Sequence, residues 1–160
     1  MVFLRGQNLD PAQFMEFARA MGKPVEYPFV KGIAGFPEII EVKKLEHEKM
    51  NFGGIWHSDT AYLQEPPMAS MLLAREVPPT GGDTLFANMY LAYETLSPGL
   101  KKVLETLSGV NASSKANVRL TGEARTAGDD RQREFVALHP VVRTHPETGR
   151  KALYVNVGHT

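Results

Sequence analysis

Apolar residues at helical spacing are clearest near the N-terminus of the chain. Asp10 and Pro11 are typical of a helix start, because Asp accepts hydrogen bonds from the first turn and Pro needs no partner there. Gln13, three residues after Asp10, completes a capping box. One apolar face follows at Phe14, Phe17, Ala18 and Met21. The pattern predicts a helix from Pro11 that ends at Gly22 and packs on a core.

Further along the chain, short apolar runs alternate with turn-forming residues. Such runs are typical of strands, and we expect strands at 1–4, 37–44, 69–77 and 83–86. Two more strands, 139–144 and 152–157, are predicted to form a hairpin through the loop at 145–149. Helices are predicted at 88–95 and from the Ser97-Pro98 cap to Gly109.

These elements predict a single domain, 1–160, of β-rich α+β class, built as a barrel or double sheet with helices covering a sheet face. Segment 111–134 has almost no apolar periodicity, which is typical of a lid or a mobile connection. We therefore expect this segment to be poorly ordered.

Charge and composition narrow the class of protein. Lys and Arg number 18 and Asp and Glu number 18, so the net charge is zero, whereas a nucleic-acid-binding protein needs a basic excess. Without Cys the chain forms neither a disulfide framework nor a thiolate zinc site. No apolar run is long enough to span a bilayer, and the N-terminus does not have the pattern of a signal peptide. We expect a cytoplasmic globular protein that binds neither nucleic acid nor membranes.

The strongest candidate for chemistry is His57-Ser58-Asp59, which follows the Gly53-Gly54 turn. On an extended segment, side chains two residues apart point the same way, so the His57 imidazole and the Asp59 carboxylate are predicted to converge on one metal ion. Two His and one carboxylate bind non-haem Fe(II) and leave positions open for a cosubstrate and dioxygen. The alternative interpretation of an isolated His-x-Asp is a surface His beside an Asx turn.

Several blocks around this motif follow one another as they do in a known family. They are Phe52-Gly53-Gly54-Ile55-Trp56-His57-Ser58-Asp59-Thr60-Ala61-Tyr62, Glu65-Pro66-Pro67, Pro79-Thr80-Gly81-Gly82-Asp83-Thr84-Leu85-Phe86-Ala87-Asn88, and the segment from His139 to Asn156. Along nearly its whole length the chain resembles the TauD/TfdA family of taurine dioxygenase-like Fe(II)/2-oxoglutarate oxygenases. The resemblance implies a double-stranded β-helix (jelly-roll, cupin-like) core with flanking helices. It also implies a dioxygenase that hydroxylates a small organic acid, sulfonate or sulfate ester and releases succinate and CO2.

The same resemblance implies roles for particular residues. His57 and Asp59 would bind Fe(II) together with a distal His, and the Thr84 hydroxyl would contact the cosubstrate 2-oxoglutarate. Tyr27, Thr60 and His159 are the candidates for contact with a small anionic substrate. The Asp59 carboxylate favours hydroxylation over halogenation, because the halogenating relatives lack it.

One departure from the family pattern concerns the C-terminal part. In relatives the second His ligand and an Arg that pairs with 2-oxoglutarate follow the Val-Asn strand, whereas this sequence stops at Thr160. We therefore expect a domain that is incomplete at its C-terminus, with negligible turnover and with unpaired sheet edges that favour a homo-oligomer. A non-catalytic jelly-roll binding domain, or an inactive fragment, is the alternative. His139 and His145 are interpreted as turn or surface residues, and a ligand role for His159 is less favoured than a pocket-lining one.

Overall fold

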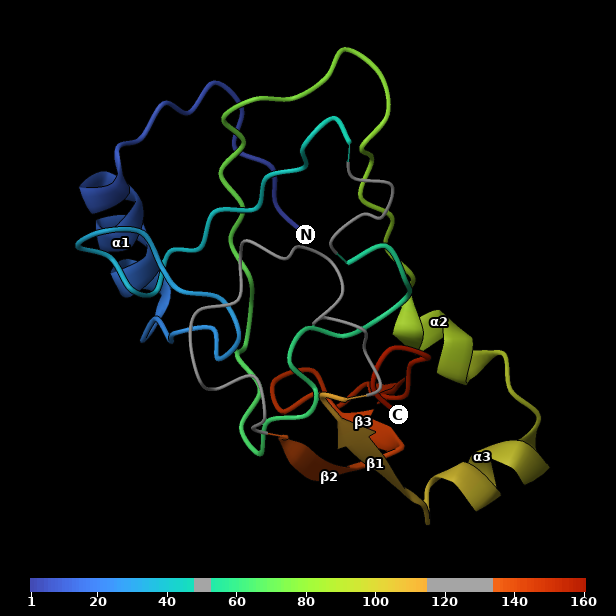
Figure 1. The fold of residues 1–160 in the computed structure, drawn as a ribbon. Coiled ribbons are helices and arrows are strands. Elements are labelled where there is room, and N and C mark those ends of the chain that lie inside the picture. The colour runs from blue at the N-terminus through green and yellow to red at the C-terminus, as the bar shows by residue number, and fades with distance from the viewer. Residues whose placement is uncertain (48–52, 115–133) are drawn as a thin grey trace.

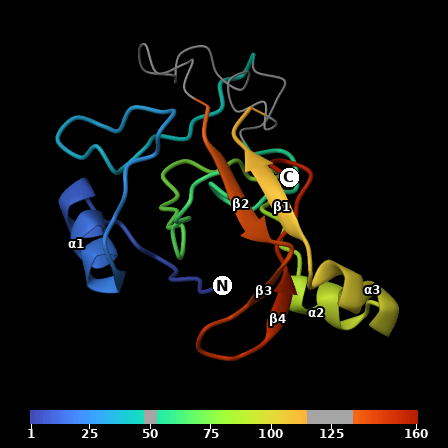
Figure 2. The same ribbon diagram turned by 90° about the horizontal axis from the view of Figure 1, so that it is seen from below.

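The computed structural model describes residues 1–47, 53–114 and 134–160 (Figure 1). Three helices and four strands lie within these ranges. They are α1 (Pro11–Met21), α2 (Met89–Glu94), α3 (Pro98–Leu104), β1 (Ser108–Ala112), β2 (Val136–Pro140), β3 (Val142–Thr144) and β4 (Lys151–Leu153). In both ribbon views α1 lies on one side of the molecule, and α2 and α3 lie on the other, beside the strands (Figures 1 and 2).

Helix α1 begins as its sequence predicts. The Asp10 side chain accepts a hydrogen bond from the Gln13 amide, and the Gln13 side chain accepts one from the Asp10 amide. The Gly22 amide donates to the Ala18 carbonyl and closes the C-terminal end. The buried face differs from the predicted one, because Met15 is the residue of α1 that is buried, while Phe17 and Met21 are exposed.

The strands form two short antiparallel ladders that are joined through one residue. β1 pairs with β2, with Val110 opposite Leu138, and β3 pairs with β4, with Val142 opposite Leu153. Val141 lies between β2 and β3, where its amide donates to the Leu107 carbonyl and its own carbonyl accepts from the Tyr154 amide. The two ladders are therefore separate two-stranded sheets that follow one another directly along the chain (Figure 2).

The C-terminal residues pack beside β1 and complete this layer. The Ala112 amide donates to the His159 carbonyl at 2.8 Å, and the Thr160 hydroxyl donates to the Asn111 side-chain oxygen at 2.9 Å. Asn111 is fully buried, and so is the Tyr62 ring. This packing brings residues 156–160 next to the segment that carries the His-x-Asp motif.

Several sequence predictions about strands are wrong for the described residues. The apolar runs at 1–4, 37–44, 69–77 and 83–86 join no ladder, with a turn at 37–38 and a bend at 75, and large side chains such as Leu72 and Leu85 are exposed. An apolar run becomes a strand only where a second segment supplies hydrogen-bond partners, and no such pairing forms for these runs in the described part of the chain. Because the three helices contain more residues than the four strands, the described fold is α+β but not β-rich.

Two predicted boundaries also shift. The helix expected to end at Gly109 ends at Leu104, because Gly109 and Asn111 take ladder positions opposite His139 and Ala137. The predicted hairpin is present only in its shorter form, β3 with β4, since residues 136–140 pair with β1 instead. Most of the segment expected to be poorly ordered, 115–133, lies outside the described residues.

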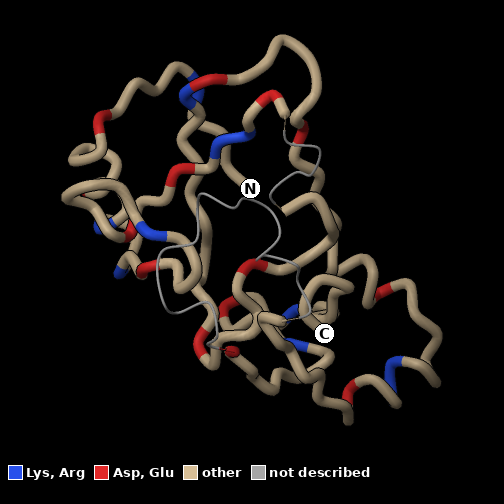
Figure 3. Tube along the Cα trace, in the orientation of Figure 1, with Lys and Arg blue, Asp and Glu red and all other residues tan. Residues whose placement is uncertain are grey.

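Charged residues of both signs are interspersed along the described chain (Figure 3). Two ion pairs tie the helical side to the hairpin, with Arg150 2.7 Å from Glu94 and Lys151 2.8 Å from Glu105. Within the described ranges, no helix has the length and apolar character that a membrane span requires.

Candidate metal site

A backbone hydrogen bond fixes the protonation pattern of His57. Its Nδ1 lies 2.7 Å from the Ile55 carbonyl oxygen. A carbonyl oxygen only accepts, so Nδ1 carries the proton and donates. In the neutral imidazole, Nε2 is then a bare lone pair, which is the form of His that binds metal ions.

Asp59 lies directly in front of this lone pair. Its Oδ1 is 3.1 Å from His57 Nε2, and its Oδ2 accepts a hydrogen bond of 2.5 Å from the Ser70 hydroxyl. The convergence of the two side chains therefore agrees with the sequence prediction, although residues 54–58 pair with no strand in the described structure. The contacts to Ile55 and Ser70, rather than a sheet, set the geometry.

The two side chains perturb each other electrostatically. The hydrogen bond to Asp59 raises the pKa of His57, and the same bond, with help from Ser70, lowers the pKa of Asp59. The side chains are 30% and 57% exposed, so the pair faces solvent and is accessible to a small ligand.

The donor set fits a divalent metal ion. Two atoms that both accept, the Nε2 lone pair and a carboxylate oxygen, repel each other at 3.1 Å unless a proton or a cation lies between them. Adjacent ligands on a six-coordinate ion, with bonds of about 2.1–2.2 Å, lie about 3.0–3.1 Å apart. Within the described part of the chain, however, no group of three or more His, Cys, Asp or Glu could hold a metal. His57 and Asp59 are therefore two side chains that could bind a metal ion together, and a third ligand at this place is not found among the described residues.

The turn that follows Asp59 is strained and tightly held. Thr60 has a positive φ of 47°, which is unusual for a β-branched residue and is common at functional sites. The Leu63 amide donates to the Thr60 carbonyl at 2.9 Å, and His139 Nε2 lies 2.9 Å from the Leu63 carbonyl oxygen. His139 is buried and its ring packs on Tyr154, so the prediction of a turn or surface residue is wrong for His139. His145 lies on the β3–β4 loop as expected, where its Nδ1 accepts from nearby backbone amides.

Beside the motif, buried polar atoms lack partners. Among the described residues, Thr60 Oγ1 and His159 Nδ1 have no hydrogen-bond partner, and the buried Tyr62 hydroxyl interacts with that of Tyr27. The His159 ring lies edge-on to Tyr62, with centroids 4.9 Å apart, and 6.3 Å from the His57 ring. Burial lowers the pKa of His159 and raises that of Tyr62, so both groups stay neutral at pH 7. Buried polar atoms without partners are a feature of binding sites.

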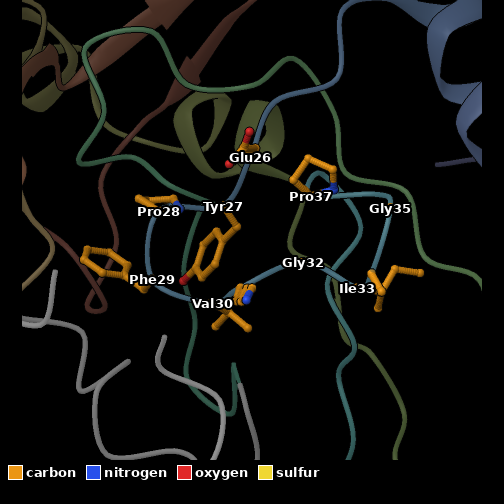
Figure 4. A pocket seen from close by; sticks show the side chains of 11 residues that line it. Glu26, Tyr27, Pro28, Phe29, Val30, Gly32, Ile33, Gly35 and Pro37 are labelled. Carbon is orange, nitrogen blue, oxygen red and sulfur yellow. The ribbon is translucent and has the colours of Figure 1, made fainter. Parts of the chain in front are cut away.

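An aromatic cluster connects these atoms to a cavity in the segment 26–37. Phe29 contacts Tyr62 and Tyr27, with ring centroids 5.6 and 5.9 Å apart, and the pKa of Tyr27 is raised by burial. The cavity measures about 550 Å³, and Tyr27 and Phe29 lie on its wall (Figure 4). Phe29 and Tyr62 thus connect Tyr27 to His159, whose ring lies near that of His57.

Thr84 is the candidate that the structure does not bring into this group. It lies on the exposed segment before α2, which is neither helix nor strand, and within the described residues no hydrogen bond joins it to His57 or Asp59. Conversely, sequence reasoning assigned no role to Ser70 or Tyr62. A lone Ser inside the apolar run 69–77 was the available signal for Ser70, and it was interpreted as part of a strand.

Comparison with known proteins connects the site to a family. The family model described as "Taurine catabolism dioxygenase TauD, TfdA family" matches residues 1–160. The alpha-ketoglutarate-dependent sulfate ester dioxygenase of Pseudomonas putida is 31% identical over 165 residues, which cover 99% of this chain and 53% of that protein.

Two solved structures are also similar. A taurine dioxygenase from Burkholderia xenovorans matches with a TM-score of 0.69 and 32% identity, over 97% of this chain and 49% of its own. AAD-2, solved in complex with Mn(II) and N-oxalylglycine, matches with a TM-score of 0.67 and 29% identity, over 97% of this chain and 53% of its own. The chain spans about half the length of the curated relatives it matches.

Proposed function

Because the chain belongs to the TauD/TfdA family, we propose that His57 and Asp59 are two of the Fe(II) ligands of a 2-oxoglutarate-dependent dioxygenase. The observation that carries the proposal is the orientation of His57. The bond from Nδ1 to Ile55 leaves Nε2 free, and Nε2 faces a carboxylate oxygen at 3.1 Å. A surface His beside an Asx turn, the alternative interpretation of the motif, would not need both contacts.

When bound, Fe(II) would supply activation of dioxygen, coupled to conversion of 2-oxoglutarate to succinate and CO2. The protein's own residues have to hold His57 neutral and Asp59 ionised. The lowered pKa of Asp59 keeps its charge at pH 7, and that charge offsets part of the charge of a divalent ion. At a pH below the raised pKa of His57, Nε2 also carries a proton, and that proton has to leave when the metal binds.

We further propose that Thr84 contacts 2-oxoglutarate. The support is its place in the Gly-Gly-Asp-Thr block, together with its exposed hydroxyl, which is free to reach a bound anion. The second His ligand and the Arg that pairs with 2-oxoglutarate are proposed to come from the C-terminal half of a family-length protein, which would also complete the jelly-roll core. The chain described here covers about half of such a protein.

The substrate is proposed to be a small organic anion, with a sulfate ester or a sulfonate preferred. The Pseudomonas putida relative is named for sulfate ester dioxygenation. Thr60 presents a buried hydroxyl that lacks a partner among the described residues, and the buried Tyr62 hydroxyl lies in the same turn. Hydroxyl donors in a buried site suit the oxygens of such an anion. Tyr27 and His159 would line the same site, next to the cavity of segment 26–37.

A second candidate function is a non-catalytic binding domain. It is favoured by one observation, that the described residues supply only two metal-binding side chains and no third at the same site. Such a domain would bind the organic anion without consuming 2-oxoglutarate.

The test is succinate release from 2-oxoglutarate with Fe(II), dioxygen and a panel of alkyl sulfate esters, sulfonates and aryloxyacetates. We expect the 160-residue chain to show negligible turnover. A version extended by the C-terminal segment of the Pseudomonas putida relative should release succinate in a substrate-dependent way, and His57→Ala and Asp59→Ala should abolish that release. If the version with the added C-terminal segment binds Fe(II) and every substrate tested but releases no succinate, the result would favour the second candidate function, a non-catalytic binding domain.

A further inference from the structure

We propose that Ser70 is a positioning residue that makes Asp59 a monodentate ligand, so that Asp59 occupies a single position on the metal. The inference rests on the proposed function, because it presupposes that Asp59 binds a metal ion. Neither the family motif nor the sequence pattern assigns a role to Ser70.

The geometry separates the two carboxylate oxygens of Asp59. Oδ1 faces His57 Nε2 at 3.1 Å, and Oδ2 accepts the Ser70 hydroxyl at 2.5 Å. A hydrogen bond to a carboxylate is among the stronger ones in proteins, and it fixes the rotation of the carboxylate plane. With Oδ2 turned toward Ser70, Oδ1 is the oxygen that is presented to a metal shared with His57.

The segment that carries Ser70 is itself anchored. Five residues further along, Arg75 Nη2 donates to the Leu9 carbonyl, just before the cap of α1. Ser70 and Arg75 thus hold a segment that joins no strand within the described residues. The hydroxyl of Ser70 is presented to Asp59 by these contacts rather than by a sheet.

The hydrogen bond from Ser70 to Asp59 matters because a metal ion has a limited number of coordination positions. A 2-His-1-carboxylate site keeps positions open for cosubstrate and dioxygen because its carboxylate takes one position. A carboxylate free to rotate can bind through both oxygens, as carboxylates do on larger cations. Ser70 would therefore preserve an open position as well as orient Asp59.

The experiment compares Co(II) binding by the wild-type chain with Ser70→Ala, Ser70→Thr and Ser108→Ala. Ser108→Ala is the matched control, because it removes an exposed Ser of β1. Affinity is measured by calorimetry, and coordination number by the visible absorption of bound Co(II). The midpoint of urea unfolding of each metal-free variant confirms that it is folded.

Loss of a partner that orients a ligand typically lowers metal affinity about 10–100-fold. We expect about tenfold weaker binding for Ser70→Ala, at the low end because Asp59 is partly exposed, together with an altered Co(II) spectrum. Ser70→Thr keeps the hydroxyl and should retain wild-type affinity and spectrum, as should Ser108→Ala. Ser70→Ala with wild-type affinity and an unchanged spectrum would overturn the role of Ser70 and leave the metal site standing. No Co(II) binding by any form, the wild type included, would overturn the metal site and the role of Ser70 together.

Discussion

Replacing His139 tests how the turn that follows His57 and Asp59 is held against β2. His139 Nε2 lies 2.9 Å from the Leu63 carbonyl oxygen, 76 residues away in sequence, and its buried ring packs edge-on to Tyr154 at 5.4 Å. His139→Phe keeps an aromatic ring beside Tyr154 and removes the donor. His139→Ala removes both the ring and the donor.

The expected changes in the free energy of unfolding follow from these contacts. Leaving a buried acceptor without a donor costs about 1–3 kcal/mol, and the low end applies because Leu63 is only half-buried. His139→Phe should therefore lose about 1 kcal/mol. His139→Ala also loses an aromatic pair worth about 0.5–1.5 kcal/mol and leaves a cavity, so its total loss should be about 2–4 kcal/mol.

Urea unfolding of the metal-free chain measures both changes. With a denaturant dependence of about 1–2 kcal/mol per molar, the midpoint of His139→Phe should fall by about 0.5–1 M. His47→Ala, which changes an exposed His, is the control and should stay within about 0.5 kcal/mol of wild type. If His139→Phe unfolds at the wild-type midpoint, the bond to Leu63 does not hold the turn and this reasoning is wrong.

Three other predictions concern the site and its surroundings. Gly158→Ala places a methyl group 3.0 Å from His57 Cβ, which should displace the imidazole and weaken Co(II) binding. A Co(II) affinity equal to that of the wild type, measured by calorimetry, would contradict this close packing. In the metal-free protein, the raised pKa of His57 stabilises the fold below about pH 6.5, and this contribution is lost as pH rises through the pKa of His57 in the folded state. The lowered pKa of Asp59 stabilises the fold above about pH 3.8, and this contribution is lost as pH falls through the pKa of Asp59 in the folded state. Urea midpoints measured across pH should therefore show this contribution largest between those two values, and Asp59→Asn should remove it. The outer face of β1 and β2 exposes Val110, Val136 and Leu138, so the chain should self-associate in sedimentation experiments. Leu138→Lys should make it monomeric, and a wild-type chain that sediments as a monomer would contradict this prediction.

Local signals in the sequence predicted the helix starts. The Asp10 capping box and the Ser97 cap both form as predicted, because such caps depend on residues three positions apart. The strands were predicted less well, since a ladder depends on a distant partner. Residues 69–77 have the composition of a strand but no partner within the described residues, whereas Gly109 and Asn111, which do not resemble strand residues, pair with β2.

Some features of the candidate site were likewise predictable from the sequence and others were not. The convergence of His57 and Asp59 was predictable because the two residues are neighbours in sequence, although the cause proved to be contacts to Ile55 and Ser70 rather than strand alternation. His139 and Ser70 were not predictable, because their roles depend on contacts to Leu63 and Asp59 that only the folded chain creates.

The most direct test of the metal site is anaerobic titration of the chain with Fe(II) under calorimetric detection, with His57→Ala and Asp59→Ala beside the wild type. One Fe(II) per chain should bind to the wild type, with release of the proton held by His57 Nε2 at a pH below its raised pKa. Both variants should lose that binding while keeping the wild-type fold. Equal Fe(II) binding by the wild type and both variants would show that the ion binds elsewhere and would contradict the account.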